Sequence, residues 1–270
     1  MVVQHNMAAS NANRQLGIST NVLSKSTEKL SSGYRINRAA DDAAGLSISE
    51  KMRSQIRGLN KASSNAQDGI SAIQTAEGAL NEAHSILQRM NELATQAAND
   101  TNTTVDRNAI QSEINALTSE VSRIASTTQF NTQNLLDGTF SSKNLQVGAL
   151  NGQKIAIDID TMNAAALSVN ALCVSTFAHA GKAMSAVQKA IEKVSKQRSS
   201  LGALQNRLEH TVNNLDNVAE NTQTAESRIR DTDMASEMVQ YSATSIIQQA
   251  GQSMLAQANS QTQGVLSLIQ

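Results

Sequence analysis

A long apolar repeat with heptad spacing constrains this chain more than any other feature of its sequence. Apolar or small side chains recur three and four residues apart from Met52 to Leu87, with Glu77 and His84 as interruptions. This spacing is typical of a long helix packed against other helices. A second stripe of small and apolar residues, from Gly69 to Ala97, runs beside the first and indicates more than one neighbouring helix.

Two further helices follow from the same periodicity. Residues 110–124 repeat the spacing behind the cap-like Thr103-Thr-Val-Asp106, and residues 184–229 carry it over a length that matches the first helix. The first helix is expected to begin at a capping box, Ser47-Ile-Ser-Glu50. A helix of about 50 residues is roughly 75 Å long, which a compact globule with a radius of gyration near roughly 18 Å does not accommodate. The sequence therefore predicts a rod of antiparallel helices.

Between the second and third rod helices the pattern changes to period two. Apolar residues alternate on both sides of Asn151-Gly152, which predicts a β-hairpin around a type I′ turn. Asp158 and Asp160 fall on alternate positions, where exposed strand residues are a better interpretation than cation ligands. The alternating apolar residues are Leu145, Val147, Ala149, Ile155, Ile157 and Ile159.

The two terminal segments are amphipathic and almost uncharged. Residues 5–32 and 234–270 each predict a helix that is not stable alone. No Asp, Glu, Lys, Arg or His occurs from Met238 to Gln270, and before Arg14 the only ionisable side chain is His5. A flexible polar tail remains one interpretation. The other is a crowded interface between identical copies, where a charge would be repeated in every neighbour and costly to desolvate.

The absence of Lys and Arg from this tail favours self-association over a membrane surface, because surface helices carry such residues on their polar face. We expect the two ends to fold on assembly and to form heterologous contacts, which produce an open helical polymer when the rotation does not close. The candidate polymerisation residues are Leu16, Leu23, Leu30, Met238, Ile247, Met254, Leu266 and Ile269.

Composition excludes several classes of function. The 22 basic and 23 acidic residues give a net charge of −1, so no basic field is available for nucleic acid or anionic lipid. Aromatic residues make up 2%, so core packing must come from aliphatic residues and alanine. No run approaches the roughly 20 apolar residues of a membrane span, and the first residues do not resemble a secretory signal peptide. We expect no membrane insertion.

The sequence predicts no enzyme, cofactor or metal site. Asp41-Asp42 and Asp231-Thr-Asp233 each precede a helical pattern, where carboxylates cap helices. Cys173 is expected to be a small buried apolar residue. No phosphate-binding loop, nucleophile elbow or dinucleotide fingerprint occurs. The histidines are scattered without metal-ligand spacing, at His5, His84, His179 and His210.

One long segment resembles a known protein family. Residues 30–59, Leu-Ser-Ser-Gly-Tyr-Arg-Ile-Asn-Arg-Ala-Ala-Asp-Asp-Ala-Ala-Gly-Leu and onward, closely resemble the amino-terminal signature of bacterial flagellin. The resemblance extends over essentially the whole chain and ends at the uncharged tail. It continues through residues 67–80, 130–138, 201–208 and 225–235.

The resemblance implies an extracellular structural subunit of the flagellar filament, exported unfolded through the flagellar type III apparatus and polymerised under a cap. The implied partners are further copies of the chain, an export chaperone, the filament cap and hook-junction proteins. The implied fold is mainly α, a long antiparallel helical rod with a small β-hairpin region and terminal helices that pair in the filament. The variable outer domains of longer flagellins are expected to be absent.

The resemblance also implies a division of the chain into an inner core and a rod. Its implied boundaries are 1–42 and 231–270 for the inner core, 43–140 and 182–230 for the rod helices, and 141–181 for the hairpin region and connection.

The family's rod carries a surface recognised by Toll-like receptor 5. Matching positions here are Gln88, Arg89, Leu93, Gln96 and Glu113, which packing between subunits also explains. Two alternatives remain open at this point. A hook–filament junction protein shares flagellin-like ends, and a coiled-coil signalling or secreted binding module explains the heptads but not the uncharged tail.

Overall fold

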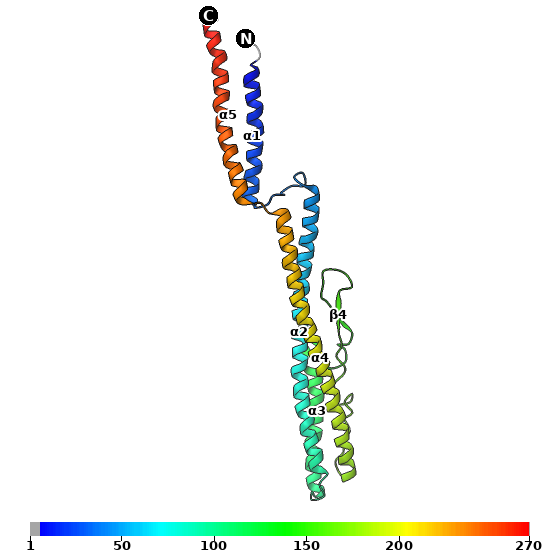
Figure 1. Cartoon of the computed structure of the whole chain (residues 1–270). Coiled ribbons are helices and arrows are strands. Elements are labelled where there is room, and N and C mark those ends of the chain that lie inside the picture. Colours follow the sequence, from blue (N-terminus) through cyan, green and yellow to red (C-terminus); the bar gives the residue numbers. More distant parts are fainter. Residues whose placement is uncertain (1–5, 270) are drawn as a thin grey trace. The chain divides into compact units, whose positions relative to one another are not determined.

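The structure of the chain, a computed structural model, describes residues 6–269, with side chains described for residues 6–261. The helices are α1 (Met7–Ser32), α2 (Ala43–Ala97), α3 (Thr104–Thr127), α4 (Phe177–Arg230) and α5 (Met234–Ile269) (Figure 1). The strands are β1 (Gln129–Phe130), β2 (Gln133–Asn134), β3 (Lys143–Gln146) and β4 (Lys154–Ile157). The predicted fold class, mainly helical with a small β region, is confirmed.

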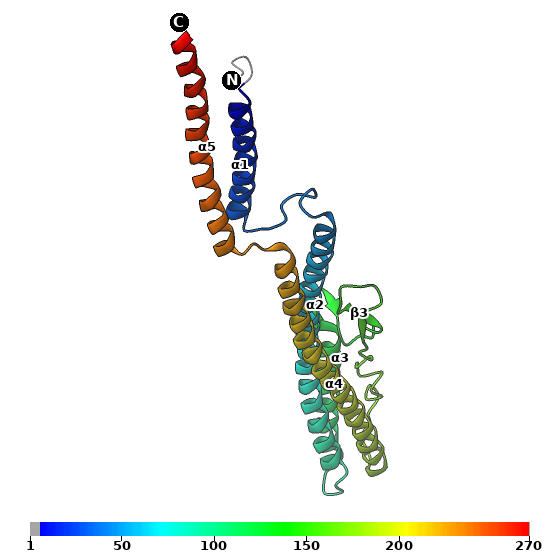
Figure 2. The ribbon, with the colours of Figure 1, turned by 45° about the horizontal axis from the view of Figure 1, so that its top comes forward.

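Residues 55–220 form one compact unit in which α2 pairs with α4 and α3 folds back beside them (Figure 2). The heptad positions of the sequence form its core: Ile73, Leu80 and Leu87 on α2 meet Val121 on α3 and Val194 on α4, each with at most 1% of its surface exposed. Burial of these aliphatic side chains holds the helices together. The predicted antiparallel packing of the three helices is confirmed.

The predicted start of the first long helix is wrong. The helix α2 begins at Ala43, four residues before the expected capping residue Ser47. Asp42 supplies the cap, because its Oδ1 accepts a hydrogen bond of 2.8 Å from the backbone N–H of Gly45. The preceding Asp41 binds the connector instead, accepting from the N–H groups of Arg38 at 3.0 Å and Asn37 at 3.3 Å. The capping role predicted for this aspartate pair therefore belongs to Asp42.

The start of α3 agrees with the sequence. Thr103 and Asp106 form a reciprocal capping box: Thr103 Oγ1 accepts from the Asp106 N–H at 3.3 Å, and Asp106 Oδ2 accepts from the Thr103 N–H at 2.9 Å. These bonds satisfy amides that have no partner inside the helix. They also lower the pKa of the Asp106 carboxyl, chiefly through the hydroxyl of Thr103.

The predicted hairpin is present as β3 and β4, which pair antiparallel with Leu145 opposite Ile155. Ile157 is buried, whereas Asp158 and Asp160 are exposed, as the alternation predicts. The predicted type I′ turn is wrong, because that turn needs a positive φ at both central residues. Gly152 has a φ of +88°, but Asn151 does not adopt a positive φ.

Two glycines of α2 allow the hairpin to lie directly on the helix. A Cβ atom at Gly58 would lie 2.8 Å from Ala149 Cβ, and one at Gly69 would lie 2.2 Å from Leu145 Cδ1. Asn65 adds a hydrogen bond of 3.2 Å from its Nδ2 to the carbonyl of Gln146. The glycines therefore set the distance between the hairpin and α2.

Side chains of α3 and α4 hold the irregular segment between β4 and α4. The Gln111 side chain bonds to the backbone of this segment as a neighbouring strand would. Its Nε2 donates to the Leu172 carbonyl and its Oε1 accepts from the Val174 N–H, both at 2.8 Å. From α4, Lys193 donates to the Ala166 carbonyl at 2.9 Å. These side-chain hydrogen bonds satisfy backbone groups that have no partner in a regular helix or sheet.

The residues up to Ser54 and from Asn221 form the second compact unit. In it α1 and α5 lie side by side (Figure 1), so both predicted terminal helices are confirmed. At the start of α5, Asp233 Oδ1 accepts from the N–H groups of Ala235 at 3.0 Å and Ser236 at 3.2 Å, the capping role predicted for it.

Candidate functional site

The inner faces of α1 and α5 pack on each other. The predicted residues Leu16, Leu23 and Leu30 are half-buried, and Leu16 Cδ1 lies 3.5 Å from where a Cβ of Gly251 would be. The two helices also share a hydrogen bond of 3.0 Å from Asn6 Nδ2 to the Ala258 carbonyl. Leu16 and Asn6 therefore join the two terminal helices of one chain.

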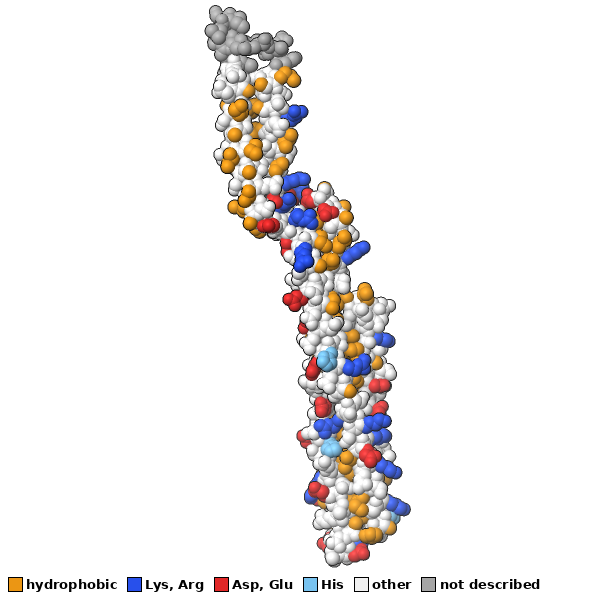
Figure 3. Space-filling view, in the orientation of Figure 1, with side chains coloured by type: hydrophobic (Ala, Val, Ile, Leu, Met, Phe, Trp, Pro, Cys, Tyr) orange, Lys and Arg blue, Asp and Glu red, His pale blue; other side chains and the backbone are white. Residues whose placement is uncertain are grey.

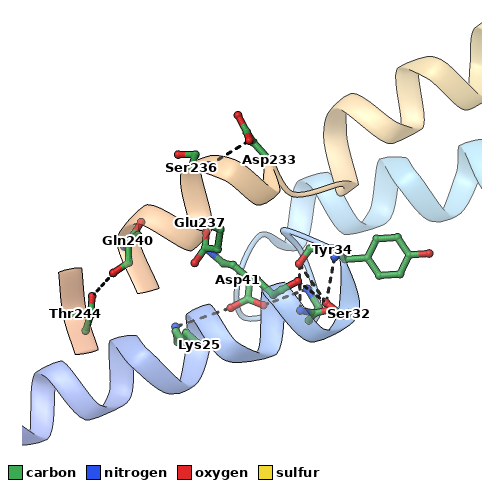
Figure 4. Close-up of polar contacts among 11 residues, drawn as sticks. Lys25, Ser32, Tyr34, Asp41, Asp233, Ser236, Glu237, Gln240 and Thr244 are labelled. Atoms are coloured by element: carbon green, nitrogen blue, oxygen red, sulfur yellow. Dashed lines mark hydrogen bonds and ion pairs between the residues drawn. The ribbon is translucent and has the colours of Figure 1, made fainter. Parts of the chain in front are cut away.

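Two buried polar side chains, Glu237 and Thr244, lie on the first turns of α5 (Figure 4). Glu237 has 9% of its surface exposed, and its Oε2 lies 3.5 Å from Lys29 Nζ on α1. Thr244, also buried, donates to the carbonyl of Gln240 at 2.7 Å. Burying a carboxylate is costly unless it is paired, so the Lys29–Glu237 pair favours one register of the two helices.

The outer face of α5 is apolar and exposed. Met238, Ile247 and Met254 have 51%, 57% and 66% of their surface exposed. Figure 3 shows hydrophobic side chains scattered along both terminal helices with few charged groups among them. Further exposed apolar residues of α5 are Met234, Val239 and Ile246. The side chains of Leu266 and Ile269, the other two predicted polymerisation residues, lie outside the described residues.

Four of the five candidate receptor residues, Gln88, Arg89, Gln96 and Glu113, are exposed on α2 and α3. Arg89 Nε donates to Glu113 Oε1 at 3.0 Å, and its Nη1 donates to Glu92 Oε2 at 3.2 Å. The Glu113 hydrogen bond raises the pKa of Arg89 above its ordinary value. Gln88 and Gln96 are exposed on the same helix, and Gln88 Nε2 lies 3.0 Å from His84 Nε2.

Leu93 differs from the other candidate receptor residues. It has 2% of its surface exposed and belongs to the core shared by α2, α3 and α4. Direct contact between this side chain and a partner is therefore minimal in the folded chain. Its structural effect is to hold the face on which Arg89 lies.

Sequence reasoning missed a cluster of polar contacts between the segment that links α1 to α2 and the segment that links α4 to α5. The guanidinium of Arg230 lies 4.8 Å over the Tyr34 ring, and its Nη1 donates to Glu50 Oε1 at 2.8 Å. Two backbone hydrogen bonds also link these segments. The Arg35 N–H donates to the Arg230 carbonyl at 2.7 Å, and the Thr232 N–H donates to the Gly33 carbonyl at 2.9 Å. The one sequence signal for this cluster was that both segments lie inside the flagellin-like signatures.

Neither a metal-binding cluster nor a membrane-spanning helix accompanies these surfaces in the described residues. Across the described residues, no three His, Cys, Asp or Glu side chains are grouped so as to hold a metal ion. In the same part of the chain, no helix is both long enough and apolar enough to cross a membrane.

Comparison with known proteins decides the family. A model of the bacterial flagellin N-terminal helical region matches residues 3–141, and a model of the bacterial flagellin C-terminal helical region matches residues 184–269. The chain belongs to the bacterial flagellin family. This flagellin is therefore a structural protein of the extracellular flagellar filament, into which it self-assembles, and not an enzyme.

Curated relatives match this flagellin along its full length. It is 55% identical to a flagellin of Halalkalibacterium halodurans and 50% identical to a flagellin of Bacillus subtilis, each over 100% of both chains. It is also 49% identical to the flagellar filament 31.3 kDa core protein of Treponema maltophilum, again over 100% of both chains. Full-length matches of this kind confirm the resemblance that the sequence motifs indicated.

Two solved structures resemble this flagellin. The crystal structure of Bacillus cereus flagellin matches with a TM-score of 0.50 and 30% identity, covering 56% of this chain and 88% of that chain. A putative flagellar hook-associated protein from Vibrio parahaemolyticus matches with a TM-score of 0.60 and 13% identity, covering 71% and 100%. The second likeness shows a shared fold alone.

The prediction that Cys173 of this flagellin is buried is wrong. Its thiol is exposed, 3.2 Å from Ser175 Oγ and 3.7 Å from His179 Nδ1. The hydrogen bond with Ser175 lowers the pKa of the thiol. The cysteine lies in the irregular segment before α4, where the apolar Val174 beside it takes the buried position.

Proposed function

We propose that the exposed apolar residues of α5, which include Met238, Ile247 and Met254, carry the contacts between copies in the filament. The exposure of these side chains carries the proposal, because large exposed apolar areas mark interaction surfaces. The leucines of α1 act within the chain, by holding α5 in place. Burial of each such side chain would contribute roughly 1.5–3 kcal/mol to assembly.

This arrangement fits a division into an inner core of residues 1–42 and 231–270, rod helices of residues 43–140 and 182–230, and a hairpin region of residues 141–181. An uncharged face suits close packing of many identical helices, because no copy places a charge beside the same charge of its neighbour. Contacts of this heterologous kind extend into a helical polymer.

Seeded polymerisation tests the proposal. Purified monomer of the Ile247→Gln/Met254→Gln variant is mixed with short filament fragments and followed by negative-stain electron microscopy. Loss of two buried apolar contacts should raise the monomer concentration needed for growth by about a hundredfold or more. Circular dichroism checks that the variant retains its helices, since both positions are exposed in the single chain.

A matched control is Val105→Gln, which changes an apolar residue with 76% of its surface exposed at the start of α3. Normal growth of this variant beside failure of the α5 variant supports the proposal. Growth of the α5 variant at the wild-type concentration would exclude its outer face as the assembly surface.

The full-length relatives favour a filament subunit over a hook–filament junction protein. They are named flagellins and filament core proteins, and they match the whole chain at 49–55% identity. A major filament subunit extends seeds into long filaments, whereas a junction protein does not, so the same experiment distinguishes the two.

We further propose that Toll-like receptor 5 recognises the exposed face formed by Gln88, Arg89, Gln96 and Glu113. The Arg89–Glu113 pair supports this, because it joins two helices and holds both charged groups at the surface. Leu93 acts from the core as a positioning residue. The same face also serves packing between subunits, so the monomer should bind more strongly than the filament.

Surface plasmon resonance with the receptor ectodomain and monomeric chain tests this surface. Arg89→Ala should weaken binding, whereas Arg123→Ala, which removes another exposed arginine paired with a nearby glutamate, should not. Equal binding by both variants would contradict the proposal.

The remaining proposed partners are a flagellar export chaperone, the filament cap and hook-junction proteins. The exposed apolar face of α5 supports a chaperone contact, because such a face needs cover before assembly. Co-purification of the chaperone with wild-type chain but not with the Ile247→Gln/Met254→Gln variant is the expected result. Equal recovery of both would place the chaperone elsewhere.

A further inference from the structure

A groove of about 830 Å³ lies where the first turns of α4 meet residues 166–168. Lys182, Lys189 and Lys193 line it from α4, seven and four residues apart. At 1.5 Å per residue this spacing places the lysines on one side of the helix, separated along its axis by about 10 Å and about 6 Å. Basic side chains, with some acidic ones among them, lie along the edge of the molecule over this part of α4 (Figure 3).

Two of these lysines have uncompensated charge. Lys193 donates to the Ala166 carbonyl at 2.9 Å, which fixes one ammonium at the groove wall. For Lys182 and Lys189, the part of the chain with described side chains provides neither an ion pair nor a hydrogen bond. The groove is therefore electropositive although the chain as a whole has a net charge of −1.

The walls of the groove combine hydroxyl groups with one exposed ring. Phe177, the first residue of α4, has 63% of its surface exposed. Ser168 has a φ of +59°, a left-handed conformation that is uncommon for a residue other than glycine and occurs often at ligand sites. Ser185 is exposed between the lysines, and a Cβ at the neighbouring Gly181 would meet nothing within 4 Å. An extended ligand can therefore lie close to the helix.

We propose that this groove binds an extended acidic polysaccharide whose sugars carry carboxylate groups. The lysines are spread along α4 rather than converging on one point, so they suit a chain of separated charges and not a single small anion. The serine hydroxyls can bind sugar hydroxyls, and the Phe177 ring can pack on the face of a sugar. The groove shares no residue with the α5 surface proposed for assembly.

An acidic helix from a protein partner fits these walls less well. Such a helix needs a broad apolar surface to bury, but Leu167 is already buried and the other apolar members are alanines beside the single Phe177 ring. The lysines are also widely spaced along α4, and this spacing suits a polysaccharide with one carboxylate per sugar.

Fluorescence anisotropy with a labelled oligogalacturonate of eight sugars tests the proposal. The full chain is used at a concentration where ultracentrifugation shows monomer. Lys182→Gln/Lys189→Gln should weaken binding by about tenfold, through the loss of two charge pairs. Phe177→Ala should weaken it further, added salt should reduce it, and a neutral maltooligosaccharide of equal length should not compete.

Lys143→Gln/Lys154→Gln is the matched control, because it removes the same charge from the exposed positions of the hairpin. Binding within twofold of the wild type is expected for this control. Equal losses in the two lysine pairs would show attraction to net charge alone and overturn the site. Absence of saturable binding, or equally tight binding of an octaglutamate peptide with the same dependence on Lys182 and Lys189, would also overturn it.

Discussion

Arg89 on α2 and Glu113 on α3 form an ion pair that spans two helices, with Arg89 Nε and Nη2 each 3.0 Å from Glu113 Oε1. About half of the Arg89 side chain is exposed, at 52%, so solvent screens the pair. We expect Arg89→Ala and Glu113→Ala to leave the thermal midpoint nearly unchanged in a circular dichroism melt. A large drop in either variant would show that the pair supports folding, and receptor measurements on it would then need reinterpretation.

Gly58 is expected to resist substitution because of the hairpin above it. An added Cβ would lie 2.8 Å from Ala149 Cβ and 3.2 Å from its Cα, so the hairpin backbone has to move. Gly58→Ala should therefore speed hydrogen exchange in residues 145–155. Gly78→Ala in the same helix meets nothing within 4 Å and should stabilise the chain by up to about 1 kcal/mol. Similar exchange in both variants would contradict this close approach.

Gln111 is expected to control the order of the segment before α4. Its amide both donates to Leu172 and accepts from Val174, so Gln111→Ala leaves two backbone groups without partners. We expect a loss of about 1–3 kcal/mol in unfolding free energy. Exchange of the Val174 amide should also become faster. Gln188→Ala, an exposed substitution on α4, is the control and should change neither quantity.

The capping box of α3 predicts a dependence of stability on pH. The hydrogen bonds from Thr103 lower the pKa of Asp106 in the folded chain relative to the unfolded chain. Its stabilising contribution is therefore present above the unfolded pKa of about 3.9 and is lost as the pH falls toward the folded value. Asp106→Asn should reduce the loss of thermal stability between about pH 5 and 3. An unchanged pH profile would contradict this role.

Cys173 should react with thiol reagents in the folded chain. Its thiol is exposed, and the Ser175 hydrogen bond lowers the pKa of the thiol and increases the fraction of thiolate. Ser175→Ala should slow labelling by a disulfide reagent at neutral pH, because the thiol pKa rises. Labelling that requires denaturant would show instead that the cysteine is protected.

Helices were the most predictable part of this chain, because their signals are local. The heptad positions from Met52 to Leu87, the Thr103–Asp106 box and the terminal amphipathic patterns each depend on residues within a few turns. The errors occurred where two local signals competed. Ser47-Ile-Ser-Glu50 has the form of a capping box, but Asp42, five residues before Ser47, caps the helix.

The candidate surfaces were only partly predictable. Periodicity identified both the α1 leucines and the α5 apolar residues but did not separate their roles. The fold leaves Leu16, Leu23 and Leu30 half-buried, with Leu16 against Gly251 of α5, and leaves Met238, Ile247 and Met254 exposed. Likewise, the receptor resemblance selected Leu93 together with Arg89, although one is in the core and the other at the surface.

The sequence by itself determined the helical periodicity, the uncharged ends and the family, because these are properties of residue order and composition along the chain. Tertiary structure alone decided which apolar residues remain exposed, that Cys173 faces solvent beside His179, and that Lys182, Lys189 and Phe177 line one groove. The physical reason is that burial and charge pairing depend on which distant segments pack together, and no local pattern specifies the neighbour on the other side.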